Sequence, residues 1–325
     1  MRIDMWADVV CAWAYIGKRR LEKAVAAWTG EPAEVVWRPF RTDPMAPAEA
    51  APMAQTLRDP LVDDALRRCA PGLSPEKNRV RVSRVAAAEG LGPPWGAAWR
   101  ANSHDAHRLI ALAYESGGAQ LQGAVAEGVM KAHFIDALDI STPEVLGRVA
   151  RDAGFPAGAG LLAGDTGEEH LRELLLRGKA MGVRTSPTMV VNGMALAGAQ
   201  PPEAIVDFLL RSSEHSPRRL PEEVERFRHA ESLLALGDPL GALTMLRPLL
   251  ADHGDDKGIR LLAARAYFHS AQLGRARHML EPLAEEAPDD SYVQLLLGRV
   301  LQRQSQDAQA APYLRIAAVM TPDYA

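Results

Sequence analysis

Asp8-Val-Val-Cys11-Ala-Trp-Ala-Tyr-Ile-Gly17 joins an apolar, strand-length run from Arg2 to Ala7 to a segment with helical spacing from Lys18 to Trp28. Cys11 therefore opens the first predicted helix. Backbone N–H groups and the macrodipole at a helix start stabilise an anion, and cysteines placed there can have pKa values of ~3.5–7.5. We expect Cys11 to be a nucleophile with a lowered pKa. The alternative is a small buried residue, the usual state of free cysteine.

Other strand and helix patterns lie on both sides of a long helical region. Glu34 to Phe40 is β-rich and alternating, and Thr188 to Val191 with Met194 to Leu196 forms a predicted hairpin around Asn192-Gly193. Pro201 to Leu210 is a predicted helix opened by prolines. The order strand–helix–strand, then hairpin–helix, resembles an α/β thioredoxin-like fold.

The region between these halves, about residues 49–181, is predicted to be a large helical insertion without a further sheet. It shows spaced apolar residues and few β-branched runs. The predicted helical segments are Val80 to Glu89, Ala97 to Glu115, Leu121 to Ala132, Pro143 to Ala153 and Gly167 to Met181.

The C-terminal third repeats with a period of 34 residues. Small residues recur in two registers and large ones in a third, and Pro288 and Pro322 end two of the units. The pattern resembles the tetratricopeptide repeat (TPR) and predicts an all-α domain of three helical hairpins over residues 218–325. The polar segment Ser212 to Pro217 is the predicted linker, which leaves residues 1–213 for the first domain. The registers are Ala242, Ala276 and Ala310; Ala230, Ala264 and Gly298; Leu246, Leu280 and Leu314.

The segment around Cys11 resembles the active-site segment of DsbA-like thiol oxidoreductases, in the FrnE-like branch related to 2-hydroxychromene-2-carboxylate isomerases. That family's pattern is Asp-x-x-Cys-Pro-Trp-Cys-Tyr-Ile-Gly, and six positions of this chain match it. Further similar segments extend the resemblance over the first 217 residues. The matching positions and segments are Asp8, Cys11, Trp13, Tyr15, Ile16 and Gly17, then Asn102 to Leu109, Phe134 to Leu146, Gly182 to Thr188 and Gly198 to Pro201.

The resemblance implies a cis peptide bond before Pro187, facing the sulfur of Cys11. Ser186 replaces the family's valine at this turn, so its hydroxyl is expected near Cys11, where it could bind a thiolate or a substrate group. Cys11, Pro187 and Ser186 are therefore the expected catalytic residues. The residues expected to line the substrate site are Trp13, Thr185, Thr188 and His107.

Ala14 departs from the family pattern, because it stands where the second, resolving cysteine is found. A two-cysteine cycle within the motif is impossible, which leaves three outcomes. Cys11 acts as a single nucleophile resolved by a small thiol such as glutathione or mycothiol, Cys69 resolves it, or the chain is a redox-inactive peptide-binding or chaperone module. A glutathione-type small-molecule transferase or isomerase is a further alternative. For Cys69 itself, a plain helical residue before a turn is the preferred interpretation.

The TPR array is expected to bind protein or peptide clients on its concave face. Arg265 and Arg299 lie 34 residues apart, near Phe268, and two aligned guanidinium groups can bind carboxylates. A solvated helix face is the alternative. The short tail after Pro322 leaves no room for a capping helix, so a partner, for example a second copy in a homodimer, is expected to cover the last hairpin.

Composition and charge exclude several classes of function. The chain has 325 residues and a net charge of −4, and neither half carries the basic excess of a nucleic-acid-binding protein. Two cysteines are too few for a disulfide scaffold, and His104 with His107 lacks further ligands, so no metal site or tightly bound cofactor is expected. No run approaches the ~20 apolar residues of a membrane span. Asp4 and Asp8 lie where a secretory signal would be apolar, which favours a cytoplasmic location.

Overall fold

The computed structural model describes residues 1–62, 70, 72–215 and 220–324. The chain divides into two compact units, one comprising Met1–Gly178 and Val183–Arg218, the other Lys179–Gly182 and Arg219–Ala325. Residues 216 and 217 of the predicted linker lie outside the described residues. Within the described ranges, no helix is long and apolar enough to cross a membrane.

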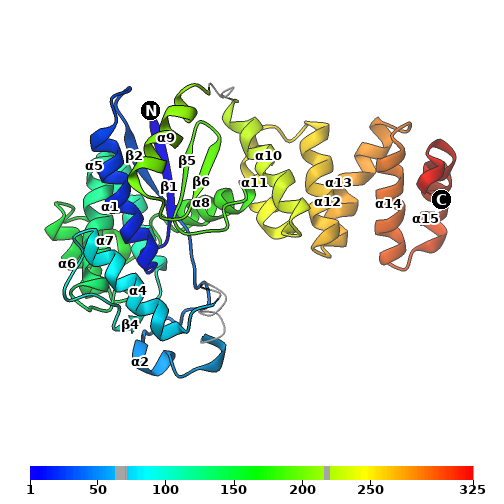
Figure 1. Ribbon diagram of the computed structural model, residues 1–325. Coiled ribbons are helices and arrows are strands. Elements are labelled where there is room, and N and C mark those ends of the chain that lie inside the picture. Colours follow the sequence, from blue (N-terminus) through cyan, green and yellow to red (C-terminus); the bar gives the residue numbers. More distant parts are fainter. Residues whose placement is uncertain (63–69, 71, 216–219, 325) are drawn as a thin grey trace. The chain divides into compact units, whose positions relative to one another are not determined.

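The first unit is built on a four-stranded sheet with the order β2-β1-β5-β6 (Figure 1). β1 pairs in parallel with β2, and β5 pairs antiparallel with both β1 and β6. Asn192 and Gly193 have φ angles of 50° and 80°, the left-handed conformation that a tight hairpin needs between β5 and β6. The predicted thioredoxin-like order of strands and helices along the chain is confirmed. The strands are β1 (Arg2–Ala7), β2 (Glu34–Pro39), β5 (Thr188–Val191) and β6 (Met194–Ala197).

Helices α1 (Ala12–Ala27) and α9 (Pro202–Ser213) pack against each other and share one core with the sheet. Ile16 and Leu21 of α1 and Phe208 of α9 are almost completely buried in that core. Burial of side chains of this size stabilises a fold by about 1.5–3 kcal/mol each. This packing fixes the start of α1, and therefore Cys11, relative to the sheet.

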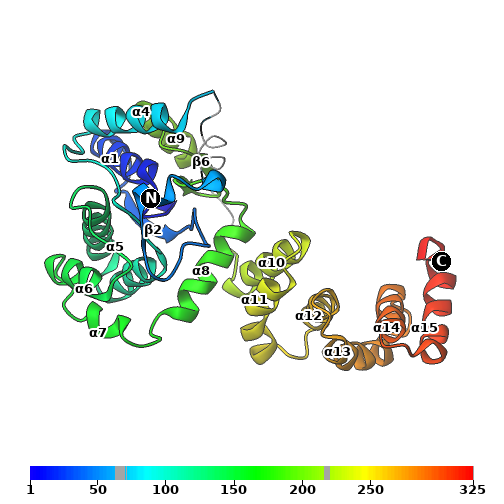
Figure 2. The ribbon, with the colours of Figure 1, turned by 90° about the horizontal axis from the view of Figure 1, so that it is seen from below.

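The helical insertion is present, although it also contains a two-stranded sheet that was not predicted. β3 (Ala51–Pro52) pairs with β4 (Trp99–Arg100), and two residues per strand are too few to show a period of two. Helix α5 is broken at Gly117 and Gly118, and α5, α6 and α7 pack against one another (Figure 2). The helices are α2 (Met53–Thr56), α4 (Pro75–Ala88), α5 (His104–Phe134), α6 (Pro143–Asp152), α7 (Gly158–Leu162) and α8 (Glu168–Ala180).

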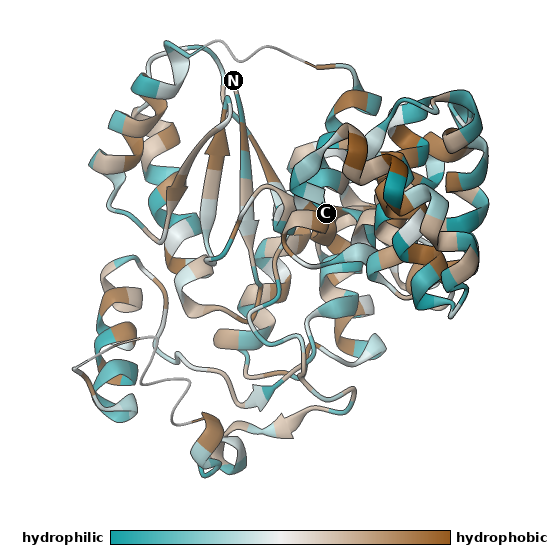
Figure 3. Ribbon diagram, turned by 90° about the vertical axis from the view of Figure 1, so that its right-hand side faces the viewer, coloured by the Kyte–Doolittle hydropathy of each residue, from teal (hydrophilic) through white to brown (hydrophobic). Residues whose placement is uncertain are grey.

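The second unit contains the three predicted helical hairpins, which confirms the repeat. Small residues of the 34-residue registers, among them Ala264, Ala276 and Gly298, are buried where paired helices touch. Apolar and polar segments alternate along these helices (Figure 3). They are α10 (Glu222–Ala235), α11 (Pro239–Asp252), α12 (Lys257–His269), α13 (Leu273–Glu286), α14 (Ser291–Arg303) and α15 (Asp307–Met320), followed by the short helix η1 (Pro322–Tyr324).

Candidate functional site

Cys11 is the N-cap residue of α1, with extended backbone angles. Its amide donates to the Asp8 carbonyl at 3.0 Å, and its own carbonyl accepts the first helical bond from Ala14 at 2.9 Å. The Cys11 thiol donates to the carbonyl oxygen of Ser186 at 3.5 Å. The structure therefore brings the start of the first helix and the turn before β5 together at one sulfur atom.

The Ser186–Pro187 peptide bond is cis, as the resemblance implies. Pro187 is buried, and its carbonyl accepts from the amide of Gly198 at 2.7 Å. A Cβ atom on Gly17 would lie only 2.8 Å from the Pro187 ring, so glycine at this position lets α1 lie close to the proline. Gly17, one of the motif residues, is thus explained by close packing rather than by chemistry.

Ser186 contacts Asp8 as well as Cys11. Its hydroxyl oxygen accepts from the backbone amide of Asp8 at 2.9 Å, while its carbonyl faces the Cys11 sulfur. Ser186 is partly exposed. The predicted proximity of Ser186 and Cys11 is observed, and the hydroxyl in addition joins the turn to the end of β1.

Asp8 is a completely buried carboxylate held by several donors. Its Oδ2 accepts from the amide and the hydroxyl of Thr42 at 2.6 and 2.8 Å, and its Oδ1 lies 3.1 Å from Nε2 of His107. Burial acts to raise the pKa of Asp8, but the hydrogen bonds and charge of His107 and the bonds from Thr42 outweigh it and lower the pKa. An anion is therefore fixed beneath the cysteine loop.

Burial raises the pKa of the Cys11 thiol above its ordinary value, and the Asp8 carboxylate acts in the same direction. Hydrogen bonds from the side chain of Ser186 and from the amides of Ala14 and Trp13 act against this without outweighing it. The predicted lowered pKa is therefore wrong. Cys11 is nevertheless partly exposed, so a substrate can reach the residue even though its resting form is the protonated thiol.

The four residues expected to line the substrate site divide into two pairs. Trp13 is partly exposed with the Arg81 guanidinium 5.3 Å from its ring centre, and Thr185 is exposed at the turn. Thr188 and His107 are each 4% exposed, and they bind the Thr185 carbonyl and Asp8, respectively. Trp13 and Thr185 therefore lie where a substrate can touch them, whereas Thr188 and His107 support the site from inside.

Sequence reasoning missed Thr42 and a group of charges around Tyr15. Thr42 follows β2 in a segment without a pattern, so nothing marked it as a partner of Asp8. The Tyr15 hydroxyl donates to Glu127 at 2.6 Å, and Lys18 and Arg19 pair with the same carboxylate. Burial and Glu127 raise the pKa of Tyr15, which keeps the phenol protonated.

His133 is a second buried histidine that the sequence did not single out. It is 1% exposed, packs edge-on against Phe134, and finds no hydrogen-bond partner for its Nδ1 among the residues that the structure describes. Burial lowers the pKa of His133 to about 4, although the charges of Asp8 and Asp139 act to raise it. A neutral imidazole therefore lies in the core at neutral pH.

In the second unit, Arg299 is exposed and donates to Gln302 at 3.2 Å. Arg265 is partly buried, and its guanidinium lies 5.9 Å from the centre of the Tyr292 ring. The guanidinium of Arg303 lies 4.7 Å from the centre of the Phe268 ring. All three residues proposed for partner binding thus already have neighbours within the array.

The paired histidines and the second cysteine of the sequence have separate surroundings. His104 and His107 do not face a common ligand site, since Nε2 of His104 bonds Glu168 at 2.8 Å and His107 bonds Asp8. Among the described side chains, no group of three or more His, Cys, Asp or Glu could hold a metal ion. Cys69 lies outside the described residues, so its proposed resolving role stays a prediction.

Comparison with known proteins gives two family matches, a DSBA-like thioredoxin domain over residues 2–210 and a tetratricopeptide repeat over residues 233–300. A solved probable DsbA oxidoreductase from Streptomyces coelicolor is 27% identical, with a TM-score of 0.57, over 68% of this chain and 94% of its own. None of the curated proteins matches.

More distant solved structures include a 2-hydroxychromene-2-carboxylate isomerase, 17% identical with a TM-score of 0.43, over 66% of this chain and 94% of its own. The cytosolic disulfide reductase DsbM from Pseudomonas aeruginosa is 18% identical with a TM-score of 0.45, over 65% of this chain and 100% of its own. The DSBA-like match spans more than half of the sequence and contains the whole site around Cys11. The chain belongs to the family of DSBA-like thioredoxin domains and carries a C-terminal tetratricopeptide repeat.

Proposed function

We propose that the protein is a thiol–disulfide oxidoreductase that uses Cys11 as its sole nucleophile, in the FrnE-like branch of its family. The observation that supports this most directly is the position of the sulfur, at the start of α1 and 3.5 Å from the Ser186 carbonyl beside cis-Pro187. Trp13 and Ser186 are partly exposed and Thr185 is exposed, so these residues are open to a substrate. A disulfide bound against this turn would present a sulfur to Cys11.

The proposed reaction has two exchange steps. The Cys11 thiolate attacks one sulfur of the substrate disulfide, a new S–S bond forms, and the other substrate sulfur leaves as a thiolate. Because position 14 is alanine, a low-molecular-weight thiol such as glutathione or mycothiol then attacks the mixed disulfide. That step regenerates the Cys11 thiolate and leaves the substrate joined to the small thiol. The small thiol is thus a co-substrate and not a bound cofactor.

The raised pKa of Cys11 determines when the enzyme works. Only the thiolate attacks, so the rate of the first step follows the deprotonated fraction, which increases about tenfold per pH unit below the pKa. Substrate groups that donate hydrogen bonds to the sulfur would lower the barrier by stabilising the thiolate. Activity is therefore expected to be slow at neutral pH and to rise on the alkaline side.

The TPR unit supplies the second part of the proposal, the recruitment of protein clients in the cytoplasm. Tetratricopeptide repeats mediate protein–protein interaction, and Arg299 is an exposed cation on the first helix of the third hairpin. Arg265 and Phe268 contribute to the same face one repeat earlier. At the other end, Ile316 and Val319 are exposed on α15, where a second copy could cover them.

The experiment that tests this function measures reduction of hydroxyethyl disulfide by glutathione in the presence of the full chain. Cys11→Ser is expected to lower the turnover at least about 100-fold, because the nucleophile supplies the covalent step. Cys69→Ser is the matched control and is expected to keep the activity. Equal loss in both variants would replace the single-nucleophile scheme with a two-cysteine cycle, and no turnover by the folded wild type would refute the enzyme.

A redox-inactive peptide-binding module is the second candidate, favoured by the raised pKa of Cys11 and by Ala14. In that case the turn at Ser186 and Pro187 binds extended peptides and the sulfur is incidental. Peptide affinity would then be the same in Cys11→Ser as in the wild type, and the disulfide assay would show no turnover. Loss of turnover with Cys11→Ser excludes this candidate.

A further inference from the structure

β2 lies at one edge of the four-stranded sheet. The amide of Glu34 donates toward β1, to the Met1 carbonyl at 2.8 Å. Because main-chain groups alternate in direction along a strand, the N–H and C=O groups of the odd-numbered residues of β2 point away from β1. These groups form the free edge of the four-stranded sheet.

At Trp37 the main-chain groups of this edge already bind a side-chain amide. The side chain of Gln122, from α5, accepts from the Trp37 amide at 2.8 Å and donates to the Trp37 carbonyl at 3.1 Å. Both partners are buried. The side-chain amide thus occupies the place that a peptide group of an added strand would take.

Val35 is the next outward-facing residue along the edge, and its main chain has no such partner among the described residues. It is partly exposed, and Glu34 beside it is exposed. Unpaired main-chain groups on an edge strand are a template for pairing with an extended chain. Gln122 bonds the main-chain groups of Trp37, whereas those of Val35 are available to an added strand.

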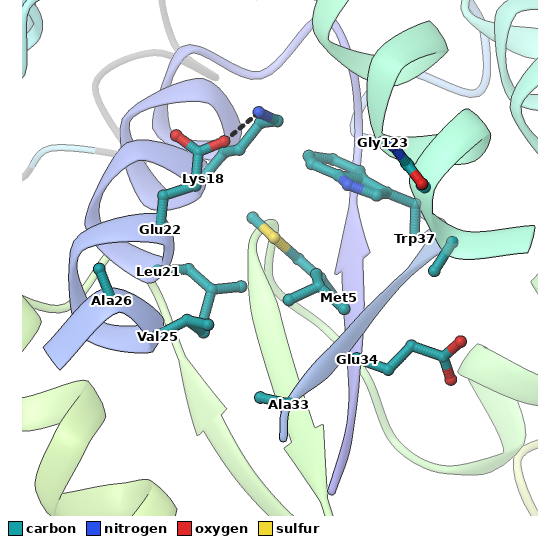
Figure 4. A pocket seen from close by; sticks show the side chains of 13 residues that line it. Met5, Lys18, Leu21, Glu22, Val25, Ala26, Ala33, Glu34, Trp37 and Gly123 are labelled. Atoms are coloured by element: carbon teal, nitrogen blue, oxygen red, sulfur yellow. Dashed lines mark hydrogen bonds and ion pairs between the residues drawn. The ribbon is translucent and has the colours of Figure 1, made fainter. Parts of the chain in front are cut away.

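An apolar pocket of about 600 Å³ lies beside this open edge (Figure 4). Val35 and Trp37 share a face of the sheet with Met5 of β1, and Leu21 and Val25 of α1 close the pocket from the other side. On the α5 side, Gly123 leaves open space where a Cβ would stand. The pocket has room for one large aliphatic side chain.

We propose that the edge of β2 binds an extended peptide segment that pairs with the main chain of Val35 and places one large aliphatic side chain in this pocket. Directly opposed residues of neighbouring strands point to the same face, so the peptide residue opposite Val35 faces the pocket. Its neighbours point to the other face, where exposed Glu34 favours basic side chains. The expected ligand has an aliphatic residue between two basic ones, and its site is separate from Cys11.

The test titrates the full chain with a fluorescein-labelled peptide, Thr-Lys-Leu-Lys-Thr, and follows anisotropy and backbone hydrogen exchange. The peptide is expected to bind saturably and to slow exchange of the Val35 amide, for which the described part of the chain offers no partner. Ala26→Arg places a long side chain in the pocket from the exposed face of α1, and is expected to weaken binding at least about tenfold.

Ala27→Arg is the matched control, because Ala27 is also exposed at the end of α1 but does not line the pocket. It is expected to keep the affinity of the wild type. Absence of saturable binding up to about 1 mM peptide, binding without protection of Val35, or equal binding by Ala26→Arg would each overturn the proposal. So would a dimer of the free chain in which Val35 is already protected, because a second copy would then occupy the edge.

Discussion

At the level of single residues, the Cys11 pKa is decided by burial rather than by the helix start. Interaction with a helix terminus is worth ~0.3–2 kcal/mol, about one pKa unit, whereas burial can shift a pKa by up to ~3–5 units. The sequence reveals that Cys11 opens a helix. It does not reveal how densely the cis-proline turn packs on the sulfur, or that Asp8 is an anion below it.

Replacing Asp8 with asparagine separates two effects of that carboxylate. Its charge raises the pKa of Cys11, so Asp8→Asn is expected to lower this pKa and to speed alkylation of Cys11 by iodoacetamide at neutral pH. The variant also weakens the bonds to His107 and Thr42 and is expected to lose about 1–3 kcal/mol of stability. Asp4→Asn is the control, because Asp4 lies in β1, four residues before Asp8. Slower alkylation in Asp8→Asn would contradict the electrostatic account.

His133 is expected to make the fold sensitive to acid. Its pKa is about 4 in the folded state against about 6.5 when unfolded, so below pH 6.5 the unfolded chain binds the extra proton. Stability is therefore full above about pH 6.5 and falls as the pH drops toward 4, by up to about 3 kcal/mol. Urea unfolding across this range measures the loss. His133→Phe should flatten the dependence, and an unchanged slope in that variant would show that other groups cause it.

At the level of elements, the sequence predicts what a local period or turn can show. Strand β1, the hairpin at Asn192-Gly193 and helices α6 and α8 were predicted near their observed bounds. The helix predicted from Ala97 was wrong at its start, because that stretch contains β4 and α5 begins only at His104. The break in α5 falls between the two helical segments that were expected there. The pair β3–β4 and the bonds of Gln122 to Trp37 were not predicted, because they depend on residues far apart in the sequence that show no pattern.

Helix α8 packs closely on the sheet at Gly178, where the helix contacts Trp6 of β1. A Cβ on Gly178 would lie 2.5 Å from the ring of Trp6, which is 1% exposed and has no room to move. Alanine gains ~1 kcal/mol of helix propensity over glycine, but overpacking costs ~1–3 kcal/mol, so Gly178→Ala is expected to be destabilising on balance.

Gly123→Ala in α5 is the matched control for that substitution, because nothing lies within 4 Å of the added Cβ. It is expected to be neutral or stabilising by up to about 1 kcal/mol. Both values come from chemical unfolding followed by circular dichroism. A stabilised Gly178→Ala variant would mean that the helix moves away from Trp6 at little cost.

At the level of the whole molecule, the two units differ in how much the sequence reveals. The helical repeat of the TPR unit could be predicted because each hairpin contacts its sequence neighbours, so one 34-residue period describes its core. The site of the first unit joins residue 11 to residue 186 and residue 8 to residues 42 and 107. Family resemblance pointed to Cys11, Asp8 and Pro187, but only the three-dimensional structure shows which of their partners are buried.

Mass mapping of Cys11 in the full-length Cys69→Ser chain, after exposure to glutathione disulfide, tests the central claim most directly. The account predicts a single mixed disulfide at Cys11 that forms faster as the pH rises from about 7 toward 10, and that excess glutathione removes. A folded chain that forms no adduct at Cys11 anywhere in this range would contradict the claim that this sulfur exchanges with disulfides.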